Sequence, residues 1–298
     1  MDYIYSIIIL VSLSIIMASS FNLSIGYGGL ISIAHPVFYA IGAYASALLA
    51  RNLGVPVPLA MLAGTAVAVA CSLFLALSSL RVSGDYLMIA SIGFQLGVLE
   101  LIKNMAWTGG AGGLTNIPAF LTPTLGRLSY VVLVVLVAML VVFIVNRIAH
   151  GPAGRALSAM RDDELAFSSL GRDATGLKLG VFALSSGLAG FAGSLYAHYF
   201  RYLTPEQFDV LQSAALLTMI VVGGIRSTWG PVVGAVILQV LPQAITFLDL
   251  PTSVLGPLQG FLFTGLVLVF MFVRPQGLVA AGDVWRSHSA TVPHGRHS

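Results

Sequence analysis

The sequence predicts an all-α integral membrane protein: a polytopic bundle of about 8–10 transmembrane segments, some of them broken by Gly and Pro. Only 8% of the 298 residues are Asp, Glu, Lys or Arg, whereas a soluble domain carries about 25%. Hydrophobic residues make up 57% of the chain, and the mean hydropathy is +0.95. Apolar runs long enough to cross a bilayer flank one charge-rich segment, residues 147–178.

The candidate spans follow from length, because a membrane helix needs about 20 mainly apolar residues. Gly and Pro cluster between or at the ends of these runs, notably at residues 26–29, 35–36, 109–113, 223–224 and 230–231. Irregular backbone at membrane depth survives only where protein or a water-filled cavity satisfies it, so these breaks are candidate half-helices or re-entrant turns around a pathway. The spans are expected near residues 3–20, 36–50, 57–79, 86–102, 129–146, 179–200, 211–223, 231–248 and 258–273.

Small residues line one face of the run at residues 179–200, including Gly187, Gly190 and Gly193. Small residues at helical spacing let backbones approach closely, so this run is expected to pack tightly against other helices.

The charge-rich segment determines the predicted orientation of the chain in the membrane. One charge at mid-bilayer costs about 2.5–3.5 kcal/mol on insertion scales, so residues 147–178 are expected in water. With this segment in the cytosol, ten of the 14 Lys and Arg fall on the cytosolic side and four outside, as the positive-inside rule requires. The N-terminus is then outside and the C-terminus cytosolic. We expect one transmembrane domain at residues 1–280 and a disordered cytosolic tail at residues 281–298.

Within this segment we expect a short helix, because Gly151 and Pro152 suit a helix start and Gly171 suits a stop. Four large apolar residues form a stripe along it, interrupted by an acidic turn: Leu157, Met160, Phe167 and Leu170. Two interpretations stay open. The helix is a solvated surface element, or its stripe meets a soluble partner while the charges set the register.

Several classes of function are disfavoured. The basic residues are scattered along the sequence, so no nucleic-acid partner is expected. Membrane lipid is an expected partner. Cys71 is the only cysteine, which rules out an internal disulfide. Neither lysine ends a GxxxxGK[ST] loop, so ATP-driven work needs another subunit. The acids at residues 162–164 lack a facing acidic cluster, so a metal-dependent enzyme is disfavoured. An ion-driven carrier usually shows ionisable residues in mid-span, and the nearest candidates lie towards predicted span ends.

Polar and glycine residues near the first break are the candidate solute path. The turn at Tyr27, Gly28 and Gly29 offers backbone N–H and C=O groups to a polar solute. His35 could gate or line this path, although capping or packing is the alternative. The remaining candidates are Tyr86 and Gln95, with an interfacial position as the alternative for the tyrosines.

An ordered set of motifs resembles the branched-chain amino-acid ABC permeases of the LivM type. It begins with Gly-Tyr-Gly-Gly-Leu-Ile-Ser-Ile-Ala-His at residues 26–35, followed by Ile-Gly-Ala-Tyr at residues 41–44. The resemblance covers roughly residues 20–280. Further matching pieces lie at residues 81–87, 108–110, 113–114, 154–157, 161–162, 164, 189–196, 229–231, 234–235 and 274–278. Pro36 and residues 225–228 depart from the family pattern.

The resemblance implies a heteromeric importer. Its partners would be a second related permease, two cytosolic ATPase subunits and an extracytoplasmic solute-binding protein, with ATP and Mg in the ATPases and no cofactor in this chain. Residues 154–171 would be the segment that couples to an ATPase, through Arg155, Leu157, Met160, Arg161, Asp162, Glu164, Phe167 and Gly171.

The solute is expected to be a branched-chain or related amino acid. Relatives in this family also carry urea, short amides or aromatic acids, and these remain alternatives. A stand-alone secondary carrier is the competing class, and it would transport without ATPase subunits.

Overall fold

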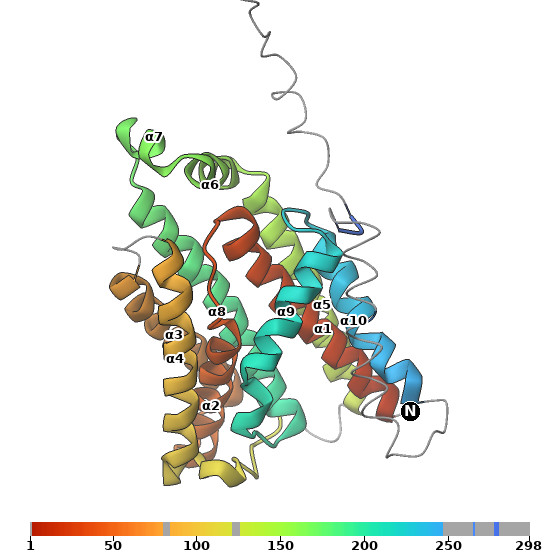
Figure 1. Cartoon of the computed structure of the whole chain (residues 1–298). Helices are drawn as coiled ribbons and strands as arrows, with labels where there is room; N and C mark the ends of the chain where they lie inside the picture. The colour runs from red at the N-terminus through yellow and green to blue at the C-terminus, as the bar shows by residue number, and fades with distance from the viewer. Residues whose placement is uncertain (1, 80–83, 121–125, 247–264, 266–276, 280–298) are drawn as a thin grey trace, which may run out of the picture.

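The computed structural model describes residues 2–79, 84–120, 126–246, 265 and 277–279, and its regular elements there are helices (Figure 1). This confirms the all-α fold class. The expected span at residues 258–273 and the tail at residues 281–298 lie outside the described residues. The helices are α1 (Asp2–Asn22), η1 (Leu23–Tyr27), α2 (His35–Asn52), α3 (Val57–Ser79), α4 (Gly84–Asn104), η2 (Ala106–Thr108), η3 (Gly110–Gly112), α5 (Gly126–Ala149), α6 (Pro152–Asp162), α7 (Glu164–Ser169), α8 (Ala174–Phe200), η5 (Pro205–Phe208), α9 (Val210–Gly223) and α10 (Gly230–Thr246).

Local chemistry explains where helix ends depart from the expected spans. α8 begins at Ala174, not near residue 179, because the Asp173 carboxylate accepts a hydrogen bond from the Gly176 N–H at 2.9 Å and caps the helix. α2 has Pro36 in its first turn, where the missing N–H would have had no helical partner. α1 runs on past residue 20 into the π turn η1.

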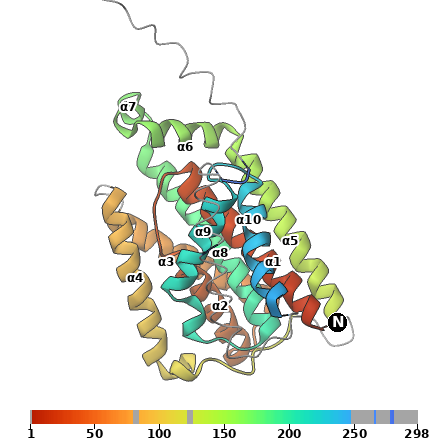
Figure 2. The same cartoon turned by 45° about the vertical axis from the view of Figure 1, so that its right-hand side comes forward.

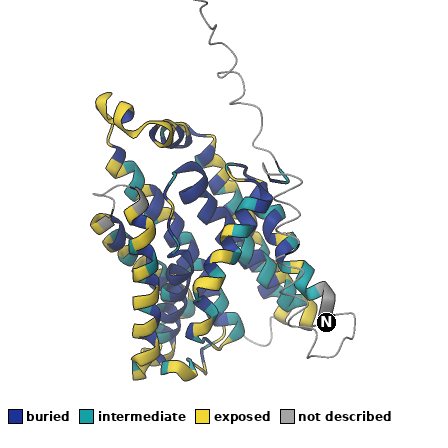
Figure 3. Cartoon of the chain, in the orientation of Figure 1, coloured by how far each residue is buried: buried dark blue, intermediate teal, exposed yellow. Residues whose placement is uncertain are grey.

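Within the described ranges, five helices are long and apolar enough to cross a membrane: α1 with η1, α3, α4, α5 and α8. α10 is apolar but shorter, and α2 and α9 complete the bundle (Figures 1 and 2). The outward sides of α3, α4 and α5 are largely exposed (Figure 3). Large apolar side chains are exposed on these surfaces, where lipid tails would contact them: Leu62, Phe74, Ile89, Leu136 and Phe143.

The centre of the bundle is the packing of α2, α3 and α8. A Cβ atom on Gly42 of α2 would collide with the backbone of Gly190 on α8, and one on Gly193 would collide with the Tyr39 carbonyl. The Ser194 hydroxyl donates to the Gly42 carbonyl at 3.1 Å. These contacts confirm that the small-residue face of residues 179–200 serves close helix packing.

The segments that connect the helices lie at the two ends of the bundle. α6 and α7 lie across one end, and α1 begins at the other (Figures 1 and 2). At the end away from α6, Leu114 and Leu203 form an isolated antiparallel bridge, and the Tyr202 hydroxyl donates to the Gly112 carbonyl at 3.3 Å. The relative placement agrees with the charge-based topology. The side of the membrane that each end faces stays a prediction.

The expectation of one helix in the charge-rich segment is wrong. α6 and α7 are separate because Asp163 adopts extended backbone, with φ −154° and ψ 101°. Its carboxylate accepts a hydrogen bond from the Ala166 N–H at 2.9 Å and caps α7, which is the position that Asp favours over a helix interior. The expected stop is present, since Gly171 has a φ of +76° beyond the end of α7.

Candidate solute path and coupling segment

The glycine-rich turn forms where α1 ends. η1 closes with a hydrogen bond from the Gly28 N–H to the Leu23 carbonyl at 3.1 Å, and Gly29 then takes a φ of +67°, which favours glycine. From there the chain returns into the bundle as irregular backbone at residues 30–34 (Figure 1). α2 therefore begins inside the protein, beside α1.

Protein groups satisfy much of this irregular backbone. The Leu30 N–H donates to the Ser24 carbonyl at 3.1 Å, and the Ile33 N–H donates to the Ser91 hydroxyl of α4 at 2.8 Å. On the other side, the Ser213 hydroxyl of α9 donates to the Ile33 carbonyl at 2.9 Å. The return segment is thus held between α4 and α9, as irregular backbone at membrane depth requires.

Gln95 is part of this support. Its buried amide Nε2 donates to the carbonyls of Phe208 and Asp209 at 3.2 and 3.1 Å, and its Oε1 accepts from Ser213 at 3.1 Å. Both ends of the amide are therefore engaged within the protein. A solute would have to compete with these bonds to reach it.

The other expected path residues lie in different settings. His35 is buried, stacks on Phe21 with ring centroids 4.7 Å apart, and places Nε2 2.9 Å from the Ser20 hydroxyl. Tyr27 is also buried and donates its hydroxyl to the Arg226 carbonyl at 2.8 Å. Tyr86, by contrast, is 57% exposed near the start of α4. The structure thus places Tyr27 and the glycines in one turn, His35 and Gln95 in packed interiors, and Tyr86 on the surface.

Arg161 joins the coupling segment to the glycine-rich turn. Its Nη1 donates to the Gly26 carbonyl. Its side-chain stem lies beside Gly29, where an added Cβ atom would be 2.8 Å from Arg161 Cγ. Partial burial and the neighbouring Arg226 charge lower the pKa of the Arg161 guanidinium, while the charge of Asp162 opposes this shift. One guanidinium thus connects α6 directly to the backbone at the end of α1.

A third segment, the turn at residues 224–228, completes this arrangement. The Arg226 N–H donates to Asn22 Oδ1 at 3.2 Å, and Asn22 Nδ2 donates to the Ser227 carbonyl at 3.0 Å. Arg226 also reaches the Ser158 hydroxyl of α6 at 3.5 Å. We call Asn22, Tyr27, Ser158, Arg161 and Arg226 the turn cluster.

Sequence reasoning missed Asn22, Ser158 and Arg226. The departure of residues 225–228 from the family pattern was one signal for Arg226. The φ of Arg226, +67°, marks the sharp turn that these residues form. Nothing in the sequence indicated that this turn meets the end of α1, because the two lie about 200 residues apart in the chain.

Most of the apolar stripe lies against the bundle, and the role of its residues in contacting an ATPase stays a prediction. Leu157, Met160 and Phe167 are buried within the chain, where α6 contacts α5, η1 and α8. The break at Asp163 allows α6 to lay its apolar face on the end of the bundle. Leu170 is 78% exposed, and Leu165, which the stripe did not include, is 84% exposed.

The charged residues of the segment mostly face outward. Arg155, Asp162 and Glu164 are exposed, and Glu164 pairs with Lys178 of α8 at 2.5 Å. This ion pair ties α7 to the start of α8. The surface available to a partner is therefore made of these charges together with Leu165 and Leu170.

Comparison with known proteins gives a consistent result. Residues 3–272 match the family model described as the permease component of branched-chain amino acid transport systems. The chain is 34% identical to a high-affinity branched-chain amino acid transport system permease protein LivM of Salmonella typhimurium, over 89% of this chain and 67% of the relative. It is 33% identical to the LivM protein of Escherichia coli with the same coverage.

A more distant relative is a probable branched-chain amino acid transport permease protein LivM of Methanocaldococcus jannaschii, 27% identical over 68% of this chain and 62% of the relative. No solved structure matches.

Proposed function

The chain belongs to the family of permease components of branched-chain amino acid transport systems, and from this premise we propose that it is the transmembrane subunit of an ATP-binding-cassette importer for branched-chain or related amino acids. A multi-pass membrane protein of this family has transport, not enzymatic turnover, as its activity. ATP hydrolysis would take place in two cytosolic ATPase subunits. A second related permease and an extracytoplasmic solute-binding protein would complete the system.

The observation that carries this proposal is the direct contact between α6 and the glycine-rich turn. The sequence has no phosphate loop of its own, so work must arrive through a surface that another subunit can move. α6 and α7 lie across one end of the bundle and expose charges and two leucines there (Figure 2). Arg161 then links this surface to Gly26 at the end of α1.

The path would run past this turn. Tyr27, Gly28 and Gly29 stand where η1 gives way to irregular backbone, and a movement of α6 would act on them first. In this proposal His35 and Gln95 hold the return segment in position, since both are engaged with protein groups. Tyr86 would contribute from the exposed start of α4, where a second permease or lipid would meet it.

Reconstitution tests the proposal. The chain is co-expressed with the permease, ATPase and binding-protein genes that neighbour it, and uptake of labelled leucine, isoleucine and valine is measured in proteoliposomes. We expect uptake that requires both ATP and the ATPase subunits and that an uncoupler leaves unchanged. Uptake by the chain alone, abolished by an uncoupler, would instead establish a secondary carrier. Turnover of solute in detergent without partners would point to an enzyme.

The solute class is tested in the same system. Urea, short amides and aromatic acids are offered alongside the branched-chain amino acids, because the family resemblance leaves them as alternatives. ATP-dependent uptake of one of these without uptake of amino acids would retain the importer and replace its solute.

A further inference from the structure

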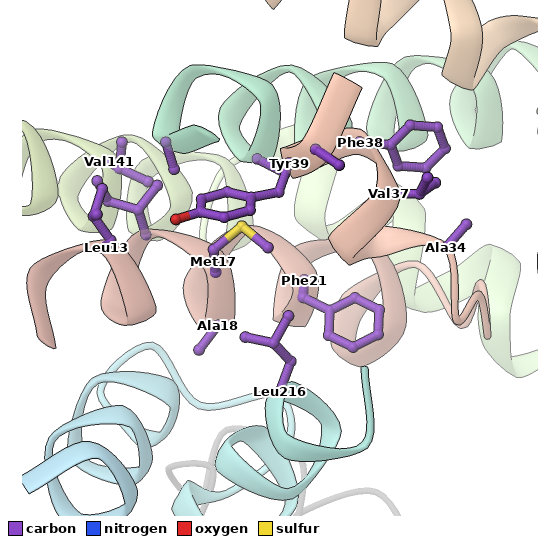
Figure 4. Close-up of a cluster of buried hydrophobic side chains, with 14 of the residues drawn as sticks. Leu13, Met17, Ala18, Phe21, Ala34, Val37, Phe38, Tyr39, Val141 and Leu216 are labelled. Atoms are coloured by element: carbon purple, nitrogen blue, oxygen red, sulfur yellow. The ribbon is translucent and has the colours of Figure 1, made fainter. Parts of the chain in front are cut away.

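A cavity of about 290 Å³ lies inside the bundle, bordered by α1, α2, α8, η5, α9 and α10. It sits about halfway along α1, away from the turn cluster at the end of that helix, because Ser14 and Met17 form part of its wall. Figure 4 labels four of the residues that line it, Leu13, Met17, Tyr39 and Leu216, and shows the Tyr39 hydroxyl directed along α1 toward Leu13.

The lining of the cavity includes several hydrogen-bonding groups. Gln207, Gln212, Gln239 and Ser14 supply amides and a hydroxyl. Oε1 of Gln239 accepts from Ser14 at 3.4 Å, and Oε1 of Gln207 accepts from the Thr204 N–H at 3.4 Å, which leaves their NH₂ groups available to the cavity. Among the residues that the structure describes, the Gln212 amide has no hydrogen-bond partner.

The lining also includes aromatic and aliphatic side chains. The rings of Tyr39, Tyr196 and Phe208 pack together, with Tyr39 centroids 5.8 Å from Tyr196 and 5.4 Å from Phe208. Tyr39 is buried, yet within the described part of the chain neither its hydroxyl nor that of Tyr196 has a hydrogen-bond partner. Leu216 and Met17 extend this surface.

Tyr39 is buried, whereas Gln212 and Tyr196 are half-buried along the cavity. A bilayer core supplies no water, so at membrane depth a polar group without a hydrogen bond favours a polar partner. The volume holds about ten waters at roughly 30 Å³ each, or one small solute, since ligand pockets begin near 300 Å³. A lining that combines amide and hydroxyl groups with aliphatic and aromatic side chains fits a solute with a polar head and an aliphatic side chain.

The lining also discriminates by charge. Of the residues described in the structure, none that lines the cavity is Asp, Glu, Lys, Arg or His. A solute with net charge would enter without a counter-ion, which is strongly unfavourable in a low-dielectric interior. A zwitterion keeps its two charges close together and has no net charge, so amide and hydroxyl groups can solvate it.

We propose that this cavity is a solute-binding station within the single chain, which accepts one small solute of zero net charge with an aliphatic side chain and excludes acidic and basic amino acids. The inference rests on the proposed import function and adds a second place of contact beyond the glycine-rich turn. In it, Tyr39 and Gln212 hydrogen-bond the polar head, while Met17 and Leu216 contact the side chain.

Solute protection of a cysteine tests the station directly. On a Cys71→Ala background, Ser14→Cys is assembled into the full complex and treated with a small membrane-permeant maleimide, and Gln212→Cys is treated in the same way. Ser72→Cys is the matched control, because Ser72 is buried between α3 and α8 and does not line the cavity.

We expect Ser14→Cys to react and Ser72→Cys to stay unlabelled. A transported neutral amino acid at ten times its dissociation constant should slow the reaction about tenfold by occupancy, whereas lysine and glutamate should leave it unchanged. The station is overturned if no transported solute protects Ser14→Cys or Gln212→Cys, if charged amino acids protect equally, or if neither cysteine reacts. Failure of the proposed import function would be distinguished from failure of the station, because the unmodified complex would then not accumulate amino acids.

Tyr39→Phe gives an independent readout, since it removes one unpaired oxygen and little else. We expect the half-saturating solute concentration to rise roughly three- to tenfold, as for loss of one hydrogen bond, while the maximal rate stays unchanged. Tyr5→Phe, on α1 but outside the cavity lining, is the matched control and should have no effect. An unchanged half-saturation in Tyr39→Phe would overturn the assignment of this hydroxyl to the solute.

Discussion

At the scale of single residues, Arg161 joins regions that lie 135 positions apart. Its guanidinium meets the Gly26 carbonyl, and its stem occupies the space that Gly29 leaves by lacking a Cβ. Arginine suits this position because its planar head keeps several donors in fixed directions, whereas lysine offers one compact charge. The contact depends equally on both partners, since a side chain at Gly29 would push the stem away.

Arg161→Met is therefore expected to weaken coupling without preventing assembly. A hydrogen bond of this kind contributes about 0.5–1.5 kcal/mol, which corresponds to a fall of roughly three- to tenfold in solute moved per ATP hydrolysed. The measurement is the ratio of uptake to ATPase activity in proteoliposomes. Arg51→Met, exposed at the end of α2 and outside the coupling segment, is the control and should keep the ratio of the unmodified complex. An unchanged ratio in Arg161→Met would remove this contact from the coupling route.

At the scale of elements, the division between α6 and α7 separates two tasks. α6 lays Leu157 and Met160 on the bundle, while α7 presents Leu165 and Leu170 to solvent. The apolar periodicity of the sequence identified a helix with a stripe, but periodicity does not say which neighbour the stripe meets. The Asp163 cap, which turns the chain between the two helices, decides that question.

Substitutions on the two faces should therefore differ in kind. Leu165→Asp and Leu170→Asp are expected to weaken ATPase binding about 10- to 100-fold each, because burying a large apolar side chain contributes roughly 1.5–3 kcal/mol. Co-purification of the ATPase subunits measures this effect. Leu157→Asp should instead lower the thermal stability of the permease itself, as a carboxylate would enter its interior. Full ATPase binding by both α7 variants would show that α7 is not a docking surface.

The cap of α7 can be tested alone. Asp163→Ala should destabilise α7 by about 1 kcal/mol, whereas Asp163→Asn should retain the helix, because Asn caps as well as Asp. Hydrogen exchange of the α7 amides, including Ala166 N–H, reports the difference as a roughly fivefold loss of protection in the alanine variant alone. Equal exchange in both variants would mean that the break between α6 and α7 does not depend on this cap.

At the scale of the whole molecule, the sequence predicted the fold class and most spans, because hydropathy and length are local properties that the bilayer enforces. It also predicted the close packing of α8 through its small residues. It could not predict the turn cluster or the central cavity. Arg226 meets Ser158, and Tyr39 and Gln212 line the same cavity, so distant parts of the chain come together in ways that no local pattern records.

The orientation is a prediction at this scale. On a Cys71→Ala background, an impermeant thiol reagent should label Thr115→Cys in intact cells and Ser169→Cys only after permeabilisation. Both positions are exposed, and they belong to opposite ends of the bundle. The reason is the ten-to-four division of Lys and Arg between the two sides. Ready labelling of Ser169→Cys from outside would invert the topology.

The glycine contacts among α2, α3 and α8 limit how the protein can change shape. The three backbones are in close contact at glycines: Gly42 lies against Gly190, Gly193 against Tyr39, and Gly64 against Gly42. Sliding one helix by a turn would drive side chains into gaps sized for a hydrogen atom. The three helices are therefore expected to move as one rigid unit relative to α1 and α9, to which residues 28–34 and 201–209 connect them.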